Sequence, residues 1–240
     1  MTLRLGGSWR SSAVRDQPRL WFTASTLNEQ LIQGTRLSHP FCPPTLLTNR
    51  HLQSILGVLL FSRPKLRYQR SLLTLHDGGV VCLDQVPALS HGAPIALIVP
   101  GLTGNSQSGY VRHLVLALAQ RGFRGIVLNY RGYGMGLKTP LVTCSALVQD
   151  IQDAVQFVRS QYPQAKIYAC GFSMGANSLV KLLGQNGMFG INPGISAAVS
   201  VSNPFNFLKL SHNLRLRVNE LLYSRFLAWR LKREILLKET

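Results

Sequence analysis

Short, continuous apolar runs alternate with helical periodicity along most of this chain, and no other feature constrains its fold as strongly. Ile95–Val99 is apolar at every position, which is typical of a strand buried on both faces of a parallel sheet. Residues 111–120 then carry apolar side chains at helical spacing. Further strands are predicted at 125–130, 166–170 and 195–201, and helices at 145–159 and 174–183. Alternating strands and helices predict an α/β fold whose sheet is mostly parallel, with flanking helices.

A hairpin is predicted before this alternation begins. Residues 68–75 and 80–86 are rich in strand-forming side chains, and the four residues between them read His-Asp-Gly-Gly. Asp-Gly between two such runs is a strong hairpin signal. We therefore expect two antiparallel strands at the start of the sheet.

Length, hydropathy and cysteine content limit the number of domains and the class of protein. The 240 residues suit one domain of ordinary size. No segment reaches the roughly 18 consecutive apolar residues of a membrane-spanning helix. The four cysteines are far apart and include no metal-ligand pair: Cys42, Cys82, Cys144 and Cys170. This pattern favours a reducing, intracellular compartment over a disulfide framework.

The net charge of +17 is concentrated at the two ends. Residues 1–70 hold ten Lys and Arg against two acids, and residues 209–240 hold eight against three. Nucleic-acid binding is disfavoured because no helix-turn-helix, zinc-ligand set or RNP-like motif accompanies the charge. Residues 1–40 are Arg- and Ser-rich and poor in acids, as in an organellar transit peptide or a disordered extension. Organellar and cytoplasmic locations therefore both stay open.

The strongest chemical motif follows the strand predicted at 166–170. Gly171-Phe172-Ser173-Met174-Gly175 matches Gly-x-Ser-x-Gly and leads into a predicted helix. Such a nucleophile elbow holds a serine on a strained turn, so that its hydroxyl stands above the sheet. The elbow glycines, Gly171 and Gly175, remove the Cβ atoms that would clash there. Ser173 is therefore the predicted nucleophile.

An oxyanion hole is predicted from two backbone N–H groups. The first belongs to Met174, directly after the nucleophile. The second belongs to Leu102, in the Gly-rich loop that follows Ile95–Val99. Glycine-rich loops after strands often serve only as turns, but the combination with the elbow favours a catalytic role.

Several segments resemble one family of α/β hydrolases. They are 100–104 (PGLTG), 108–113 (SGYVRH), 129–132 (NYRG), 137–140 (LKTP), 171–177 (GFSMGAN) and 202–206 (SNPFN). The family is the YheT-like, embryogenesis-associated branch, related to α/β-hydrolase-domain lipases and esterases. Residues 49–54 (NRHLQS) resemble its N-terminal segment, and Tyr130 stands where the family commonly has His. The resemblance implies a serine carboxylic ester hydrolase for acyl esters, acylglycerols or phospholipids that needs no metal or organic cofactor.

The acid and the histidine that usually follow such a serine do not occur after Ser173 in the required order. In this fold the triad runs Ser, then Asp or Glu, then His. After Ser173 the chain has one histidine, His212, and every later acid follows it. His212 is not expected to be the base, and His113 is expected to make a contact at a helix start. Asp150 and Asp153 are expected on a solvated surface or in a helix salt bridge.

The simplest explanation is a C-terminal truncation. The core would occupy 41–208 and the start of a helical cap 209–240, without the last strands and most of the cap. Residues 214–237 are predicted as a basic amphipathic helix or helix pair, which packs as a lid or makes peripheral contact with a membrane. Two functions stay open: an ester hydrolase that is weak or inactive as this chain, and a non-catalytic hydrolase-like binding protein.

Overall fold

The computed structural model describes residues 18–236 except 42, 45–46, 61–63, 88–89, 91, 134 and 145–147. The chain divides into two compact units, Met1–Ser62 and Arg63–Thr240. The first contains helices α1 (Thr26–Gln33) and α2 (Arg50–Leu60). The extension predicted for residues 1–40 thus includes one helix, and its first 17 residues lie outside the described part. No described residue of this unit is buried.

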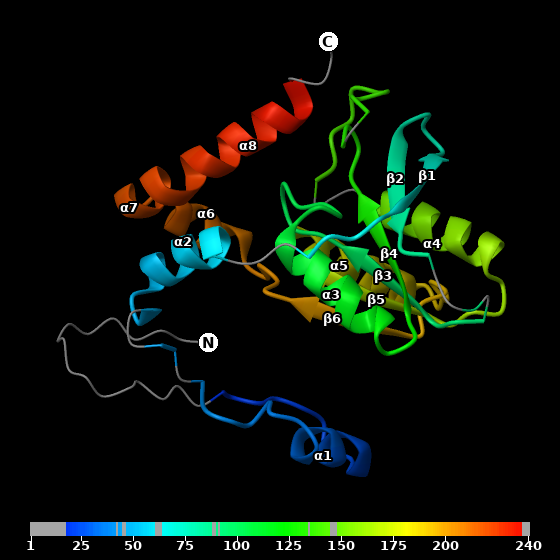
Figure 1. Ribbon diagram of the computed structural model, residues 1–240, viewed down its shortest axis with the longest axis horizontal. Helices are drawn as coiled ribbons and strands as arrows, with labels where there is room; N and C mark the ends of the chain where they lie inside the picture. Colours follow the sequence, from blue (N-terminus) through cyan, green and yellow to red (C-terminus); the bar gives the residue numbers. More distant parts are fainter. Residues whose placement is uncertain are drawn as a thin grey trace. The chain divides into compact units, whose positions relative to one another are not determined.

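The second unit contains a six-stranded mixed sheet with strand order β1-β2-β4-β3-β5-β6 (Figure 1). The strands are β1 (Gln69–Thr74), β2 (Val80–Gln85), β3 (Ile95–Val99), β4 (Arg124–Asn129), β5 (Ile167–Phe172) and β6 (Ala197–Val201). β1 pairs antiparallel with β2, and β2 with β4, whereas β4, β3, β5 and β6 are mutually parallel. The predicted hairpin and the mostly parallel sheet are both confirmed.

Helices cover both faces of this sheet (Figure 1). They are α3 (Gly109–Ala119), α4 (Gln149–Gln161) and α5 (Met174–Met188). Val111 and Val115 of α3 pack with Ile98 and Val127 of the central strands. A second, larger apolar cluster forms where residues of α4, such as Ile151, pack against the opposite face of the sheet. The helices are amphipathic, so each buries only its apolar stripe.

The order of strands fixes where a ligand can bind. From β3 the chain crosses by α3 to β4 on one side, and from β5 it crosses by α5 to β6 on the other. The carboxyl ends of the neighbouring strands β3 and β5 therefore carry loops that diverge. In open α/β sheets this divergence creates the crevice in which ligands bind.

The C-terminal region is helical. It contains α6 (Phe207–Leu214), α7 (Arg217–Asn219), the π-helical turn η2 (Glu220–Ser224) and α8 (Arg225–Leu236). The sequence predicted a helix or helix pair only from residue 214, so α6 was missed. None of the helices in the described part of the chain is both long enough and apolar enough to cross a membrane.

One element differs in its environment from the prediction. The segment 195–201 was predicted as a buried strand, but residues 196–200 are exposed. β6 is an edge strand: in the described sheet it pairs with β5 on one side and with no strand on the other. Its apolar composition is that of an inner strand, whereas its position is that of an edge strand.

Candidate active site

Ser173 occupies a strained turn between β5 and α5. Its backbone angles are φ 50° and ψ −114°, outside the regions that residues with a Cβ normally adopt. The Ser173 N–H donates to the Val201 carbonyl at 2.9 Å, which ties the turn to the end of β6. The side chain is exposed. This is the geometry of a nucleophile elbow, with the hydroxyl accessible above the sheet.

The glycines on either side of Ser173 allow strand, helix and loop to approach closely. A Cβ on Gly171 would lie 2.6 Å from the Ala176 Cα. A Cβ on Gly175 would collide with the carbonyl oxygens of Val99 and Pro100, at the end of β3. Neither position therefore has room for a Cβ.

The loop after β3 packs directly against this turn. A Cβ on Gly101 would lie 3.2 Å from the Ser173 Cβ, so the loop and the nucleophile are neighbours. Thr103 in the same loop has a positive φ of 60°. Among the described residues, no backbone carbonyl accepts a hydrogen bond from the Leu102 or the Met174 N–H. Met174 also begins the 15-residue helix α5, whose positive dipole end favours a developing negative charge.

Buried polar residues hold the far end of this loop against the sheet. The Ser106 hydroxyl donates to the Asp84 carboxylate of β2 at 2.5 Å, and the Ser106 N–H donates to the Asn129 side chain at 2.8 Å. Arg70 of β1 makes two hydrogen bonds to the same carboxylate, at 2.7 and 2.8 Å. All of these groups except Arg70 are buried. No sequence pattern indicated this network, because its members lie on four separate segments.

Two tyrosines bind the start of the loop. The Tyr130 hydroxyl, at the end of β4, donates to the Pro100 carbonyl. The Tyr110 hydroxyl, on α3, accepts from the Gly101 N–H at 3.1 Å. Burial raises the pKa of both hydroxyls, so both stay protonated. Tyr110 also packs edge-on against Phe172, at 4.9 Å between ring centres.

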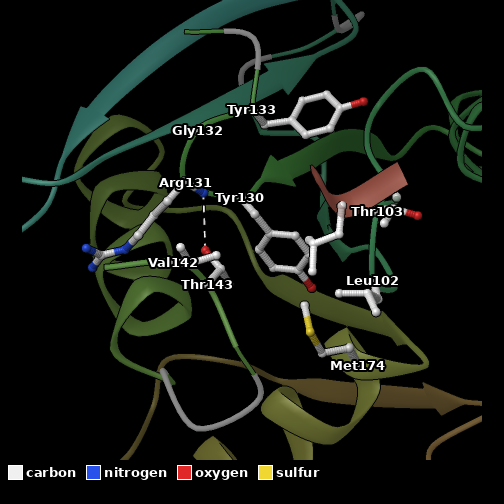
Figure 2. A pocket seen from close by; sticks show the side chains of 11 residues that line it. Leu102, Thr103, Tyr130, Arg131, Gly132, Tyr133, Val142, Thr143 and Met174 are labelled. Atoms are coloured by element: carbon white, nitrogen blue, oxygen red, sulfur yellow. Dashed lines mark hydrogen bonds between the residues drawn. The ribbon is translucent and has the colours of Figure 1, made fainter. Parts of the chain in front are cut away.

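A small pocket of about 40 Å³ lies beside the two predicted oxyanion donors (Figure 2). Its lining comes from the β3 loop, the segment after β4, residues 142–143, Met174 and Leu231 of α8. Figure 2 shows the Tyr130 ring pointing toward Leu102 and Met174. Among the described residues that line this pocket there is no His, Asp or Glu. The pocket can accept an apolar group, but its lining contains no base for Ser173.

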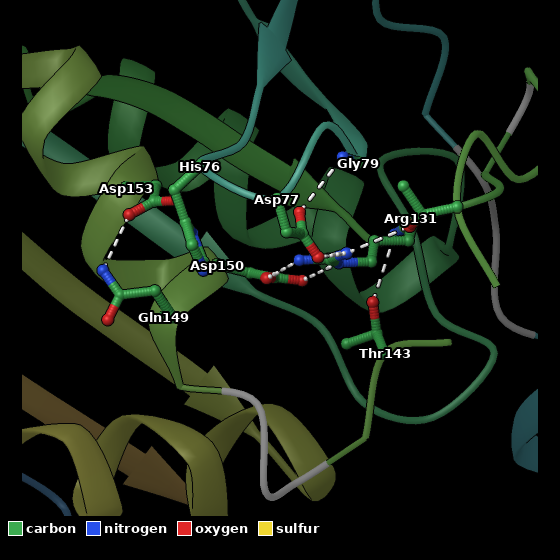
Figure 3. A network of polar contacts seen from close by, with 9 residues as sticks. His76, Asp77, Gly79, Arg131, Thr143, Gln149, Asp150 and Asp153 are labelled. Carbon is green, nitrogen blue, oxygen red and sulfur yellow. Dashed lines mark hydrogen bonds and ion pairs between the residues drawn. The ribbon is translucent and has the colours of Figure 1, made fainter. Parts of the chain in front are cut away.

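Arg131 anchors the segment after β4 through a buried ion network (Figure 3). Its guanidinium makes two hydrogen bonds to Asp150 of α4, at 2.8 and 2.6 Å, and one to Asp77 of the hairpin turn at 2.6 Å. Both the Arg131 and the Asp150 side chains are buried. Of the two roles expected for Asp150, it has the salt bridge and not the solvated surface, because it pairs with Arg131 inside the protein.

Histidine–carboxylate pairing occurs away from this pocket. His76 Nδ1 lies 3.0 Å from the Asp153 carboxylate, which was expected on a solvated surface or in a helix salt bridge (Figure 3). The hydrogen bond to Asp153 raises the pKa of His76. His212 lies exposed on α6, and His113 lies on α3. Within the described ranges, no three His, Cys, Asp or Glu side chains are grouped so that they could hold a metal ion.

Known proteins with similar sequences are α/β hydrolases. A family model described as "Serine aminopeptidase, S33" matches residues 92–238. The embryogenesis-associated protein EMB8 of Picea glauca is 33% identical over 191 residues, covering 75% of this chain and 41% of that protein. Human phospholipase ABHD3 is 32% identical over 184 residues, covering 73% and 44%. This chain thus spans less than half the length of these relatives.

Solved structures agree on the fold. The esterase Pf2001 of Pyrococcus furiosus superposes with a TM-score of 0.54 at 20% identity, covering 69% of this chain and 63% of that one. The resemblance to α/β hydrolases predicted from the motifs is therefore confirmed. The chain belongs to the α/β-hydrolase family that the S33 serine aminopeptidase model describes.

Proposed function

We propose that this chain carries the nucleophile half of a serine carboxylic ester hydrolase. The observation that supports the proposal best is the exposed Ser173, held at a positive φ between two candidate oxyanion donors. In the reaction, the Ser173 Oγ attacks the acyl carbonyl carbon and its proton passes to a general base. The carbonyl oxygen becomes negative and accepts hydrogen bonds from the Leu102 and Met174 N–H groups. The alcohol then leaves with a proton, and water releases the acid.

The base and its orienting acid are proposed to lie in sequence outside these 240 residues. The relatives support this view, because the chain covers 41% to 44% of their lengths. Removing triad partners lowers the rate by several orders of magnitude, yet the oxyanion hole alone still accelerates the reaction over water. The chain by itself is therefore expected to be a weak esterase.

Lipid acyl esters are the proposed substrates. Among the relatives, the zebrafish protein named monoacylglycerol lipase ABHD2 is 31% identical over 179 residues, and ABHD3 is named a phospholipase. The small pocket beside Leu102 and Met174 has apolar side chains in its lining, among them Val142 and Leu231. Such side chains suit the hydrocarbon part of an acyl ester better than a charged group.

Fluorophosphonate labelling tests the proposal directly. The probe phosphonylates an activated serine, so this chain is expected to label slowly and a longer product of the same gene quickly. Ser173→Ala is the control and must abolish the label in both. If neither product labels, the ester-hydrolase proposal is contradicted.

The alternative is a non-catalytic hydrolase-like binding protein. It is favoured by the absence of a His or carboxylate from the described lining of the pocket. In that case fatty acids or acylglycerols would bind reversibly, and Ser173→Ala would leave their affinity unchanged. Calorimetry of a monoacylglycerol with both proteins separates this function from catalysis.

We also propose that the C-terminal helices contact an anionic membrane surface. Phe226 and Trp229 of α8 are 49% and 53% exposed, their ring centres lie 6.1 Å apart, and Arg233 lies over the Trp229 ring. Residues 205–233 hold seven Lys and Arg and only one acid, Glu220. Exposed aromatic side chains among cations suit the interface of an anionic bilayer.

Vesicle sedimentation tests this contact. The chain is expected to bind vesicles with about one third phosphatidylserine and to bind phosphatidylcholine alone weakly, with binding lost at high salt. Trp229→Ser should weaken binding, whereas Phe189→Ser, which removes an exposed aromatic side chain from a segment without basic neighbours, should not. Equal binding to both vesicles, or none, would favour the alternative in which these helices pack as a lid.

A further inference from the structure

The peptide unit between Pro100 and Gly101 is held on both of its polar sides by tyrosines. Its carbonyl accepts from the Tyr130 hydroxyl, and its N–H donates to the Tyr110 hydroxyl at 3.1 Å. The two tyrosines come from different elements, the end of β4 and the first turn of α3. We infer that Tyr110 and Tyr130 form a tyrosine clamp that sets the position of the Leu102 N–H, so that both are positioning residues.

The clamped peptide has little freedom in the remaining directions. The Pro100 carbonyl oxygen lies so close to Gly175 that a Cβ there would collide with it. Gly101 packs against Ser173 and the Phe172 carbonyl in the same way, with a Cβ position 3.2 and 3.4 Å from them. The unit is thus fixed by two hydrogen bonds and by contact with the nucleophile turn.

The clamp acts on the peptide unit that precedes the one with the predicted donor. The Leu102 N–H belongs to the next peptide unit. Rotation of the Pro100–Gly101 plane therefore changes the direction of the Leu102 N–H bond. Leu102 itself is 37% exposed, and Thr103 after it adopts a positive φ of 60°. The Gly101 carbonyl, in the same peptide unit as the Leu102 N–H, accepts from the Gly104 N–H at 2.9 Å, and the tyrosines hold the start of this turn from outside the loop. Preorganised donors stabilise an oxyanion because they need not reorient during the reaction.

The two hydroxyls suit these tasks chemically. Tyr130 must donate, and its buried, protonated hydroxyl does so to a carbonyl. Tyr110 accepts from an N–H and so must direct its own proton elsewhere. Phenylalanine at either position would keep the ring packing and remove one bond from one side of the peptide. This allows the clamp to be tested with very small changes.

The test is amide hydrogen exchange of the full 240-residue chain, followed residue by residue by NMR. In Tyr110→Phe the Gly101 N–H loses its acceptor, and its exchange is expected to rise about fivefold or more. In Tyr130→Phe the Gly101 N–H keeps its acceptor. A clamp nevertheless predicts faster exchange at Gly101, because the peptide plane is released from its other side.

Tyr168→Phe is the matched control. Tyr168 lies on β5, packs against Phe123 and does not line the pocket, so this change should leave Gly101 and Leu102 unaffected. The Val127 amide in the core reports on global opening and should not change in any variant. If Tyr130→Phe leaves exchange at Gly101 unchanged, or accelerates Val127 equally, the clamp is refuted.

The catalytic meaning of the clamp rests on the proposed function, but the exchange test does not. Exchange is measured without substrate, so a chain without esterase activity still gives a result. Fluorophosphonate labelling of the same variants adds the functional readout: the clamp predicts slower labelling of Ser173 in Tyr130→Phe than in Tyr168→Phe. Altered exchange with no labelling of any protein would uphold the clamp and contradict the ester-hydrolase proposal.

Discussion

At the scale of single residues, the buried pair of Arg131 and Asp150 makes the clearest energetic prediction. Both side chains are nearly inaccessible, 3% and 2% exposed. Asp150→Asn leaves the buried Arg131 charge with Asp77 as its remaining carboxylate partner. This is expected to lower the free energy of unfolding by about 3–5 kcal/mol. Urea denaturation followed by circular dichroism measures this. The control His76→Gln breaks an exposed pair and, at about pH 9 where His76 is neutral, should leave the midpoint almost unchanged.

His76 gives the chain a pH-dependent contribution of known sign. Its hydrogen bond to the Asp153 carboxylate raises the pKa of His76 above its usual 6.5. The stabilisation is therefore fully present below about pH 6.5 and is lost as the pH rises through the raised pKa. The melting temperature of the wild type should exceed that of His76→Gln at about pH 6 and equal it at about pH 9. A difference that persists at the higher pH would contradict this assignment.

At the scale of elements, two of the three glycines in helix α5 have opposite requirements. Gly175 faces the carbonyl oxygens that end β3, whereas Gly184 is exposed and has no atom within 4 Å of the Cβ position. Gly184→Ala should stabilise the protein by about 0.5–1 kcal/mol through helix propensity. Gly175→Ala should destabilise it by about 2 kcal/mol or more, because backbone must move. Equal effects in urea denaturation would contradict the close approach at Gly175.

Much of the sheet could be predicted from the sequence because its signals are local. The strand Ile95–Val99 is correct to the residue, and the helix that starts at Met174 follows directly from the elbow motif. The exposure of β6 could not be predicted, because an apolar run reports what a strand can bury and not what covers it. Helix α6 was missed because only eight residues carry its pattern.

Only part of the candidate site could be predicted in the same way. The sequence pointed to Ser173, Leu102 and Met174 because Gly-x-Ser-x-Gly and a Gly-rich loop are contiguous patterns. Their catalytic roles stay predictions. The supports around them depend on tertiary contact: Tyr110 and Tyr130 meet at one peptide, and Ser106 meets Asp84 across 22 residues. No spacing rule connects such residues before the sheet has formed.

At the scale of the whole molecule, the two units contribute unequally to stability. All buried apolar side chains of the described chain lie between Leu75 and Leu182. Shortening the chain to residues 63–240 should therefore leave its free energy of unfolding and its urea m value nearly unchanged, with m in the usual range of about 1–3 kcal/mol per M. A large fall in m would mean that residues 1–62 bury substantial surface, contrary to their exposure in this structure.

The backbone conformation that exposes Ser173 is unfavourable for any residue that has a side chain. A φ of 50° with ψ −114° matches the first central position of a type II′ turn, where glycine is preferred. Holding a serine there costs on the order of 1–3 kcal/mol. Ser173→Gly should therefore raise the free energy of unfolding by about 1 kcal/mol while removing the hydroxyl. This position is a trade-off between stability and activity, in which the more stable protein would be the one without a nucleophile.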